Sequence, residues 1–165
     1  MKKTDKFLVG FVIFIIVLVA VAFTIALARP KPTYQAEDKP EGVAFNYLFA
    51  LQQGDYERAY GYLSPSVKGY PADAAKFRKD IQDSWNFGGL KNGSLSLEVV
   101  SSESVGDVVI VTVKETTFYE GGLFDSGESS STFEMTLEQK KNGKWKITDS
   151  ERYWVYCWDI AKGCK

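Results

Sequence analysis

Acid–base chemistry in this chain would depend on carboxylates, tyrosines or lysines, because the 165 residues include no histidine. The candidate base is Glu115, which lies in phase with a run of alternating valines, Val109, Val111 and Val113. Alternate residues of a strand point to the same face, so the Glu115 carboxylate is predicted to face inward. In an apolar interior its pKa would be raised, and with a nearby tyrosine it could act as a base. The favoured interpretation, however, is that Glu115 is solvated where the strand leaves the core.

The absence of histidine also excludes several classes of function. Ser-His-Asp and Cys-His catalysis both need an imidazole, and so do zinc sites with histidine ligands. Charge is nearly balanced, with 20 Lys and Arg against 21 Asp and Glu, and neither sign is clustered. A nucleic-acid-binding surface is therefore not expected. No metal site and no cofactor are predicted.

Two glycine-rich segments carry apolar side chains that could contact a ligand or a partner. They are WNFGGLKNG, residues 85–93, and YEGGLFDSGESSS, residues 119–131. Connections of this length are often functional. The competing interpretation is that their side chains only close the end of the core. The predicted binding residues are Trp85, Phe87, Tyr119 and Phe124.

The elements that position these residues follow an apolar N-terminal stretch, residues 7–28, which contains no charged side chain. As a helix it would span roughly 33 Å, enough to cross a hydrocarbon core of about 30 Å. The flank at residues 1–6 carries three lysines and favours an N-terminus inside the cell. We expect a single-pass anchor in the cell membrane, with the rest of the chain outside the cytoplasm. Cleavage after Ala28, which ends an A-x-A sequence, is the alternative.

Two cysteines support this location. Cys157 and Cys164 enclose the C-terminal segment CWDIAKGC. In an oxidising compartment such a pair is most simply a disulfide, and by chain entropy a loop of this size contributes about 2.5 kcal/mol. A redox pair is the less favoured alternative, because the spacing is not C-x-x-C.

The segment between anchor and domain, residues 29–40, contains three prolines and predicts a semi-extended linker. The folded, extracytoplasmic domain is expected over residues 41–165. Helical periodicity begins at once, because Ala44, Leu48 and Leu51 share one helical face.

Two further helices are expected before the first strand. Asp55 is a natural N-cap for the second helix, and Ser64-Pro65 ends it, because a residue before proline avoids the α region. The third helix is predicted over residues 71–85, with Asp73 in its first turn.

After the helices the period of the apolar residues changes from helical to alternating. Strands are predicted within residues 94–100, 107–120, 131–140 and 144–158, and Asn142-Gly143 predicts a two-residue hairpin turn. Glu138 is out of phase with its apolar neighbours and is expected in solvent. In RYWVYCWD, residues 152–159, both faces are apolar, so this part is expected to be buried or to form a contact surface.

This order of elements predicts an α+β fold in which about three helices pack on one face of a curved antiparallel sheet of four or more strands. AFNYLFALQQGDYERAYGYLSP, residues 44–65, resembles the opening helices of the nuclear transport factor 2-like superfamily. NGKWKITDS, residues 142–150, is similar to the last hairpin of those cone-shaped domains. The resemblance covers residues 40–155 and is nearest to membrane-anchored bacterial members of unknown role.

The resemblance implies a fold but does not choose a function, since the superfamily holds enzymes, protein-binding modules and small-molecule sensors. No catalytic motif of its enzymes is legible here, so no catalytic residue is carried over. We therefore expect an anchored binding or accessory domain without catalysis, which engages a protein partner or a small apolar ligand at the mouth of the cone. A lyase- or isomerase-like enzyme using Glu115 and a structural envelope domain with a filled interior are the alternatives. An open sheet face would permit a homodimer.

Overall fold

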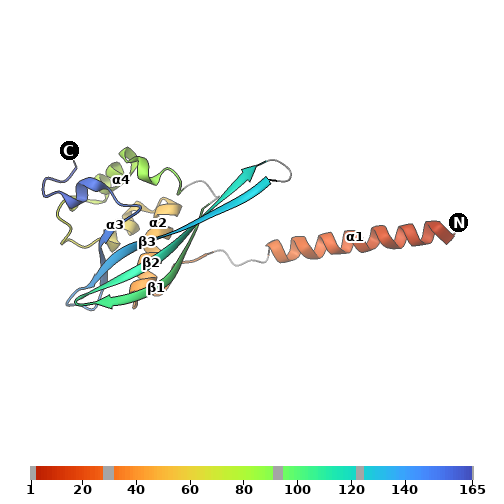
Figure 1. Cartoon of the computed structure of the whole chain (residues 1–165), viewed down its shortest axis with the longest axis horizontal. Helices are drawn as coiled ribbons and strands as arrows, with labels where there is room; N and C mark the ends of the chain where they lie inside the picture. The colour runs from red at the N-terminus through yellow and green to blue at the C-terminus, as the bar shows by residue number, and fades with distance from the viewer. Residues whose placement is uncertain (1–2, 28–31, 91–94, 122–124, 165) are drawn as a thin grey trace. The chain divides into compact units, whose positions relative to one another are not determined.

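A computed structural model describes residues 3–27, 32–90, 95–121 and 125–164. The chain forms two compact units, Met1–Thr33 and Tyr34–Lys165 (Figure 1). The first unit contains helix α1 (Lys3–Leu27). Its stretch Lys6–Thr24 has a mean hydropathy of 3.1 and is long and apolar enough to cross a membrane. A signal sequence shares these features, so the membrane anchor stays a prediction.

The second unit begins with the three predicted helices, α2 (Pro40–Gln53), α3 (Tyr56–Tyr62) and α4 (Ala74–Asp83). A short 3-10 turn, η1 (Trp85–Phe87), follows α4. The boundaries lie where the sequence places stop and start signals. Gly54 ends α2 with a φ of 72°, which suits glycine, and the Asp55 carboxylate accepts the Arg58 N–H at 3.1 Å as the N-cap of α3.

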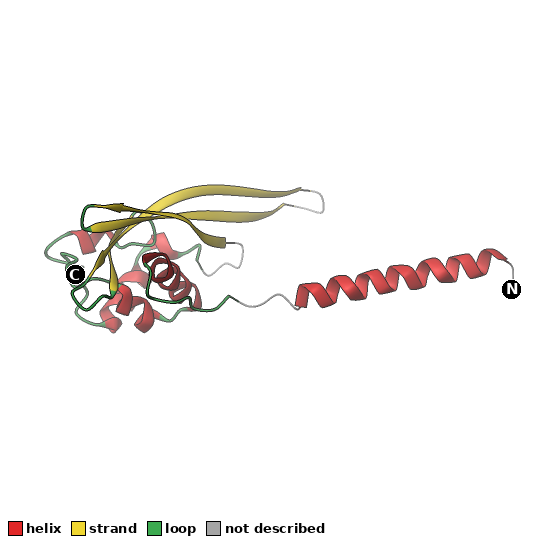
Figure 2. Ribbon diagram, turned by 90° about the horizontal axis from the view of Figure 1, so that it is seen from below, coloured by secondary structure: helices red, strands yellow, loops and turns green. Residues whose placement is uncertain are grey.

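The four strands form one antiparallel sheet in the order β1-β2-β3-β4. The strands are β1 (Leu95–Val105), β2 (Val108–Gly121), β3 (Asp125–Gln139) and β4 (Trp145–Ser150). The helices lie on one side of the sheet, and the β2–β3 hairpin extends beyond them (Figure 2). This is the predicted α+β architecture. A homodimer through the sheet stays a prediction.

The β3–β4 turn occurs at Asn142-Gly143 but is one residue longer than the two-residue turn expected. The Lys140 N–H donates to the Lys144 carbonyl at 2.9 Å, which leaves residues 141–143 in the loop. Gly143 has a φ of 78° and its N–H donates to the Lys140 carbonyl at 2.8 Å. A left-handed glycine in the last position of a three-residue loop is the common alternative to the two-residue turn.

Buried side chains of the sheet and of the helices form one apolar core. The inward residues of the sheet are at most 8% exposed, as the alternation predicted, and they are Val109, Val111, Val113, Phe133, Met135, Leu137 and Ile147. A void of about 10 Å³ lies among the side chains of Leu51, Tyr56, Ile81, Phe87 and Leu90. A void of this size holds at most one water molecule.

The domain starts earlier than residue 41, at Tyr34. The buried side chain of Asn46 holds this segment, because it accepts the Gln35 N–H at 2.7 Å and donates to the Gln35 carbonyl at 2.9 Å. The Tyr34 ring also packs edge-on against Phe49, with centroids 4.9 Å apart. Residues 34–39 are therefore part of the folded unit and not of the linker.

The last strand is shorter than predicted, because β4 ends at Ser150 and residues 152–159 do not continue it. Tyr153 has a φ of 55°, which breaks the extended conformation, and the 3-10 turn η2 (Tyr156–Asp159) follows. Trp154 and Trp158 are buried, whereas Tyr156 is 76% exposed. The expected disulfide between Cys157 and Cys164 is present.

Candidate functional site

A cleft of about 390 Å³ contains the predicted catalytic candidate Glu115, and we call it the Glu115 cleft. Three parts of the fold meet there: η1, the middle of β2, and the bend that follows β4. Its lining residues are Trp85, Asn86, Gly89, Glu115, Glu151, Arg152 and Tyr153. The structure therefore brings together two of the predicted site residues, Trp85 and Glu115, which are 30 positions apart in the sequence.

The Glu115 carboxylate has two partners on the same oxygen. Tyr153 Oη donates to Oε2 at 2.8 Å, and Arg152 Nη1 lies 2.9 Å from the same atom. The side chain of Glu115 is 15% exposed and that of Arg152 is 41% exposed. Arg152 Nη1 also donates to Ser131 Oγ at 3.0 Å, which holds the guanidinium beside the carboxylate. Glu115 thus faces a cation, so its environment is neither the apolar interior nor the open solvent that the two interpretations of the sequence gave.

Tyr153 has an unusual backbone and a buried ring. Its side chain is 6% exposed, and its carbonyl accepts a hydrogen bond from Tyr47 Oη at 2.8 Å. Burial raises the pKa of the Tyr153 phenol, and the hydrogen bond to Glu115 raises it further. Tyr153 is therefore a hydrogen-bond donor at neutral pH. The cleft combines a paired carboxylate with a protonated phenol, which can hold a polar group.

The predicted aromatic residues separate into different environments. Trp85 is 90% exposed and lines the cleft. Phe87 is 7% exposed and packs edge-on against Tyr153 at 6.2 Å, so it supports the cleft from the core side and does not line it. Tyr119 is 57% exposed near the end of β2, where it pairs with Gly127, and it is not a lining residue of the Glu115 cleft. Phe124 lies outside the described residues.

Trp85 also borders a second cleft, of about 340 Å³, which we call the Tyr156 cleft. Tyr156 lines it from η2, and Asp80 and Asp83 line it from α4. The Trp85 side chain therefore stands between two clefts, one with an Arg152–Glu115 pair and one with acidic groups. An exposed indole beside charged groups is typical of a contact surface.

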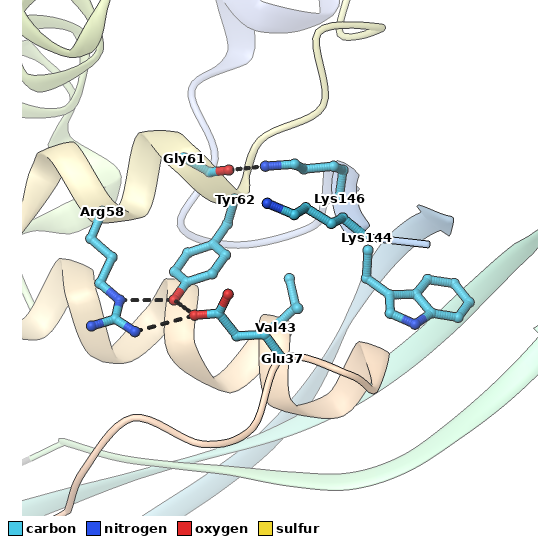
Figure 3. Close-up of a pocket in the computed structure, with 8 residues that line it drawn as sticks. Glu37, Val43, Arg58, Gly61, Tyr62, Lys144 and Lys146 are labelled. Carbon is cyan, nitrogen blue, oxygen red and sulfur yellow. Dashed lines mark hydrogen bonds and ion pairs between the residues drawn. The ribbon is translucent and has the colours of Figure 1, made fainter. Parts of the chain in front are cut away.

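A third hollow, of about 420 Å³, was not predicted from the sequence, and we call it the Lys146 pocket (Figure 3). Its polar floor is a set of three linked side chains. Arg58 Nε donates to Tyr62 Oη at 2.9 Å, Tyr62 Oη donates to Glu37 Oε1 at 2.7 Å, and Arg58 Nη2 donates to the same oxygen at 3.2 Å. The remaining lining residues are Val43, Gly61, Lys144, Trp145 and Lys146.

The electrostatics of this pocket follow from those contacts. The hydrogen bond from Tyr62 and the nearby Arg58 lower the pKa of the Glu37 carboxyl. Burial raises the pKa of Tyr62 to about 12. Lys146 Nζ donates to the Gly61 carbonyl. Desolvation lowers the pKa of Lys146, and repulsion from Lys144 and Lys140 lowers it further. The charges of Arg58 and Glu37 in the floor thus cancel each other. The two lysines have no carboxylate partner among the described residues.

The described part of the chain offers no group of three or more Asp, Glu, Cys or His residues that could hold a metal ion. The residues missed from the sequence are Arg152 and Tyr153 in the Glu115 cleft and the polar set of the Lys146 pocket. Residues 152 and 153 were assigned to a continuing strand, and the left-handed backbone of Tyr153 has no sequence signal of the kind that glycine gives.

Comparison with known proteins concerns the fold. The sequence matches no protein-family model and no curated protein. Similar solved structures include a SEC-C motif-containing protein from Rhodopseudomonas palustris, with 17% identity over 73% of this chain and 83% of that chain and a TM-score of 0.46. An NTF2-like protein with a cystatin-like fold from Novosphingobium aromaticivorans has 12% identity over 80% and 84% and a TM-score of 0.46.

A ketosteroid isomerase-like protein from Erwinia carotovora atroseptica has 11% identity over 66% of this chain and 87% of that chain, with a TM-score of 0.42. Some of these solved structures are thus described as NTF2-like or ketosteroid isomerase-like. The similarity is one of fold, and no residue role is carried over from it.

The Glu115–Arg152 pair makes a first testable prediction. Replacing Glu115 by Gln should lower the free energy of unfolding by about 2 kcal/mol, because a charge-assisted hydrogen bond is lost and Arg152 loses its ion-pair partner. Chemical unfolding of E115Q, R152M and the double variant would give the coupling energy between the two side chains. Glu103→Gln, at an exposed position of β1, is the matched control. Equal stabilities of E115Q and E103Q would contradict a structural role for the pair.

Proposed function

We propose that this protein is a membrane-anchored accessory domain that binds a protein partner outside the cytoplasm, at the surface around Trp85, and is not an enzyme. One observation carries the proposal: the described inward side chains of the sheet are buried, while a tryptophan is left 90% exposed between two clefts. Large aromatic side chains are normally buried on folding, because their burial contributes several kcal/mol. An exposed indole on a well-packed domain is best explained by a partner that covers it.

The chemistry of the surface describes the partner. Trp85 and Tyr156, at 90% and 76% exposed, supply an aromatic centre. The carboxylates of Asp83 and Glu151 and the guanidinium of Arg152 surround it. Interfaces are commonly built from aromatic anchors inside a polar rim, so a partner with an apolar pocket and polar edges fits this surface.

A small apolar ligand is less favoured than a protein. Ligand pockets typically enclose about 300–1,000 Å³ of largely apolar space. The small apolar void among the helices, beside Leu51 and Ile81, measures about 10 Å³. The larger hollows lie at the surface and carry charged side chains.

The proposed location rests on two features. Helix α1 is long and apolar enough to cross a membrane, and the Cys157–Cys164 disulfide suits an oxidising compartment. With the lysine-rich flank of residues 1–6 inside, the Tyr34–Lys165 unit would lie outside the cytoplasm.

An enzyme that uses Glu115 is the second candidate, and the 2.8 Å contact between Tyr153 Oη and Glu115 favours it. The contacts of Glu115 weigh against general-base catalysis, because its Oε2 is already paired with the Arg152 guanidinium at 2.9 Å and accepts the Tyr153 hydroxyl. A non-catalytic role therefore agrees better with the contacts of Glu115.

Site-specific photocrosslinking tests the proposal in intact cells. A photoreactive phenylalanine analogue replaces Trp85 in the full chain, and the same analogue replaces Glu103 in a matched control. We expect a discrete protein adduct from position 85 and none from position 103. Trp85→Ala should leave the thermal unfolding midpoint unchanged, because the side chain has few contacts to lose. The same adduct from both positions, or no adduct from either, would contradict partner binding at Trp85. The alternative of a structural envelope domain would then remain.

A further inference from the structure

The Lys146 pocket has positive charge that nothing in the described structure neutralises. Three cationic side chains line it, from Arg58, Lys144 and Lys146, against one carboxylate, that of Glu37. Arg58 and Glu37 form an ion pair at 3.2 Å, so these two charges cancel locally. The two lysines remain as an excess of two positive charges.

The hydrogen bonds of the two lysines also leave them available to an anion. A lysine ammonium has three donors and no acceptor. Lys146 Nζ uses one donor on the Gly61 carbonyl, and Lys144 Nζ has no hydrogen-bond or ion-pair partner among the described residues. Most of the ammonium donors in the pocket are therefore free to bind an anion.

The two lysines lie around the start of β4. Lys144 immediately precedes the strand and Lys146 is its second residue, so their side chains lie on the same side of the extended chain. Figure 3 shows both side chains extending from the strand toward Gly61 and Tyr62. Repulsion from Lys144 disfavours the charged form of Lys146, and a bound anion between the two side chains would offset that repulsion.

The third cation of the pocket, Arg58, is held in the polar floor by its own contacts. The Arg58 guanidinium lies 3.4 Å from the centre of the Tyr34 ring and is bonded to Tyr62 and Glu37. Arg58 is thus held in place by its own partners and is not available for a bidentate contact. The free donors are ammonium groups, which bind phosphate as point charges.

We propose that the Lys146 pocket binds a phosphate group carried on a small organic body, with Lys144 and Lys146 as its charge partners. Two free cations match a phosphate dianion, whereas a carboxylate would neutralise only one of them. The volume of about 420 Å³ exceeds what the phosphate itself needs, and Val43 and Trp145 supply apolar surface for the attached group. The phosphate could belong to a soluble phosphomonoester or to a lipid headgroup.

Calorimetric titration of the full chain in nanodiscs of zwitterionic phosphatidylcholine tests this inference. The probes are phenyl phosphate for a soluble phosphomonoester, monomeric dihexanoyl phosphatidic acid for a lipid headgroup, and benzoate as a matched carboxylate. We expect binding of phenyl phosphate and weak or no binding of benzoate. Binding of phosphatidic acid without phenyl phosphate would assign the site to a lipid headgroup. Failure of both phosphate probes, or benzoate binding as tight as phenyl phosphate, would overturn the proposal.

Charge-matched variants locate the binding. Lys144→Met and Lys146→Met should each weaken phosphate binding by about 10-fold or more, because each removes a charge-assisted hydrogen bond. Lys79→Met removes the same charge from an exposed position of α4 and should change the affinity by less than about 2-fold. The Lys144 side chain has no described partner, so K144M leaves the fold intact and keeps the test decisive. Equal affinities of K144M and K79M would overturn the assignment of this pocket.

Discussion

Replacing Trp158 by alanine is expected to lower the free energy of unfolding by about 4 kcal/mol, a large part of the roughly 5–15 kcal/mol that stabilises an ordinary domain. Trp158 is fully buried, and its ring stacks on Phe77 of α4 with centroids 5.1 Å apart. The Trp154 ring meets it edge-on at 5.0 Å. Truncation would therefore leave a cavity that two other aromatic rings line.

The indole N–H adds a polar contribution that a second variant separates. Trp158 Nε1 donates to Asp80 Oδ2 at 3.1 Å, and Asp80 is 5% exposed. Trp158→Phe keeps an aromatic ring and leaves that carboxylate oxygen without this partner, at a cost of about 1–3 kcal/mol. Lys76 still pairs with the other Asp80 oxygen at 2.7 Å, so the loss should fall in the lower part of this range.

Denaturant unfolding of the full chain in a neutral detergent, followed by far-ultraviolet circular dichroism, would measure both variants. Trp85→Ala is the matched control, because the same residue type is removed from a site that is 90% exposed. It should change stability by less than about 0.5 kcal/mol. If W158A were as stable as W85A, the C-terminal segment would not belong to the core.

The helical part of the domain could be predicted because its signals are local. Gly54 ends α2 and Asp55 caps α3, as their residue types indicated. Asp73 caps α4 through the Lys76 N–H at 2.7 Å, so this helix begins at Ala74 and not at residue 71. The alternation of β2 and β3 likewise gave the buried faces correctly, because both strands have one face on the core.

The C-terminal segment could not be predicted because distant residues determine it. RYWVYCWD, residues 152–159, alternates like a strand, but Trp158 is drawn to α4 and its carbonyl accepts the Gly69 N–H at 2.7 Å. A Cβ on Gly69 would lie 2.4 Å from the Cys157 carbonyl oxygen, so only glycine permits this approach. A pattern within the segment carries no information on that contact.

In the two candidate sites as well, local sequence patterns indicated some residues, whereas others are brought in by tertiary packing. The sequence singled out Glu115 but not its partner Tyr153, which comes from the bend after β4. Arg152, which neutralises Glu115, lies in the bend after β4 and has no signal in the sequence. The Lys146 pocket combines residues 37, 43, 58, 61–62 and 144–146, and Glu37 had been assigned to the linker. Such a site depends on tertiary packing alone.

Glu138 was expected in solvent and is instead a hydrogen-bond acceptor between two parts of the fold. Its Oε1 accepts from Ser64 Oγ at 2.5 Å, Ser66 Oγ at 2.7 Å and Lys140 Nζ at 2.5 Å. Its side chain is 27% exposed. Burial by itself would raise the pKa of Glu138, but the three hydrogen bonds outweigh burial and lower the pKa from 4.5 to about 2. The ionised carboxylate therefore ties the chain after α3 to β3.

The stability of the fold should accordingly depend on pH through Glu138. A carboxyl whose pKa is lowered on folding contributes its stability above the unfolded pKa of 4.5 and loses it as the pH falls toward about 2. Allowing for partial exposure to solvent, the contribution is about 2 kcal/mol at pH 7. Glu138→Gln should cost about this amount at neutral pH, and the difference from the unmodified chain should shrink steadily between about pH 5 and pH 2.

Thermal unfolding of both chains across this pH range would measure the difference, with Glu103→Gln as the exposed control on β1. Other carboxylates titrate equally in each chain, so the difference isolates Glu138. A difference that stayed constant from pH 7 to pH 2 would mean that Glu138 acts through its shape and not its charge. The stability difference from the unmodified chain should shrink with falling pH for E138Q but not for E103Q. That result would establish the carboxylate as the ionised link between Ser64, Ser66 and Lys140.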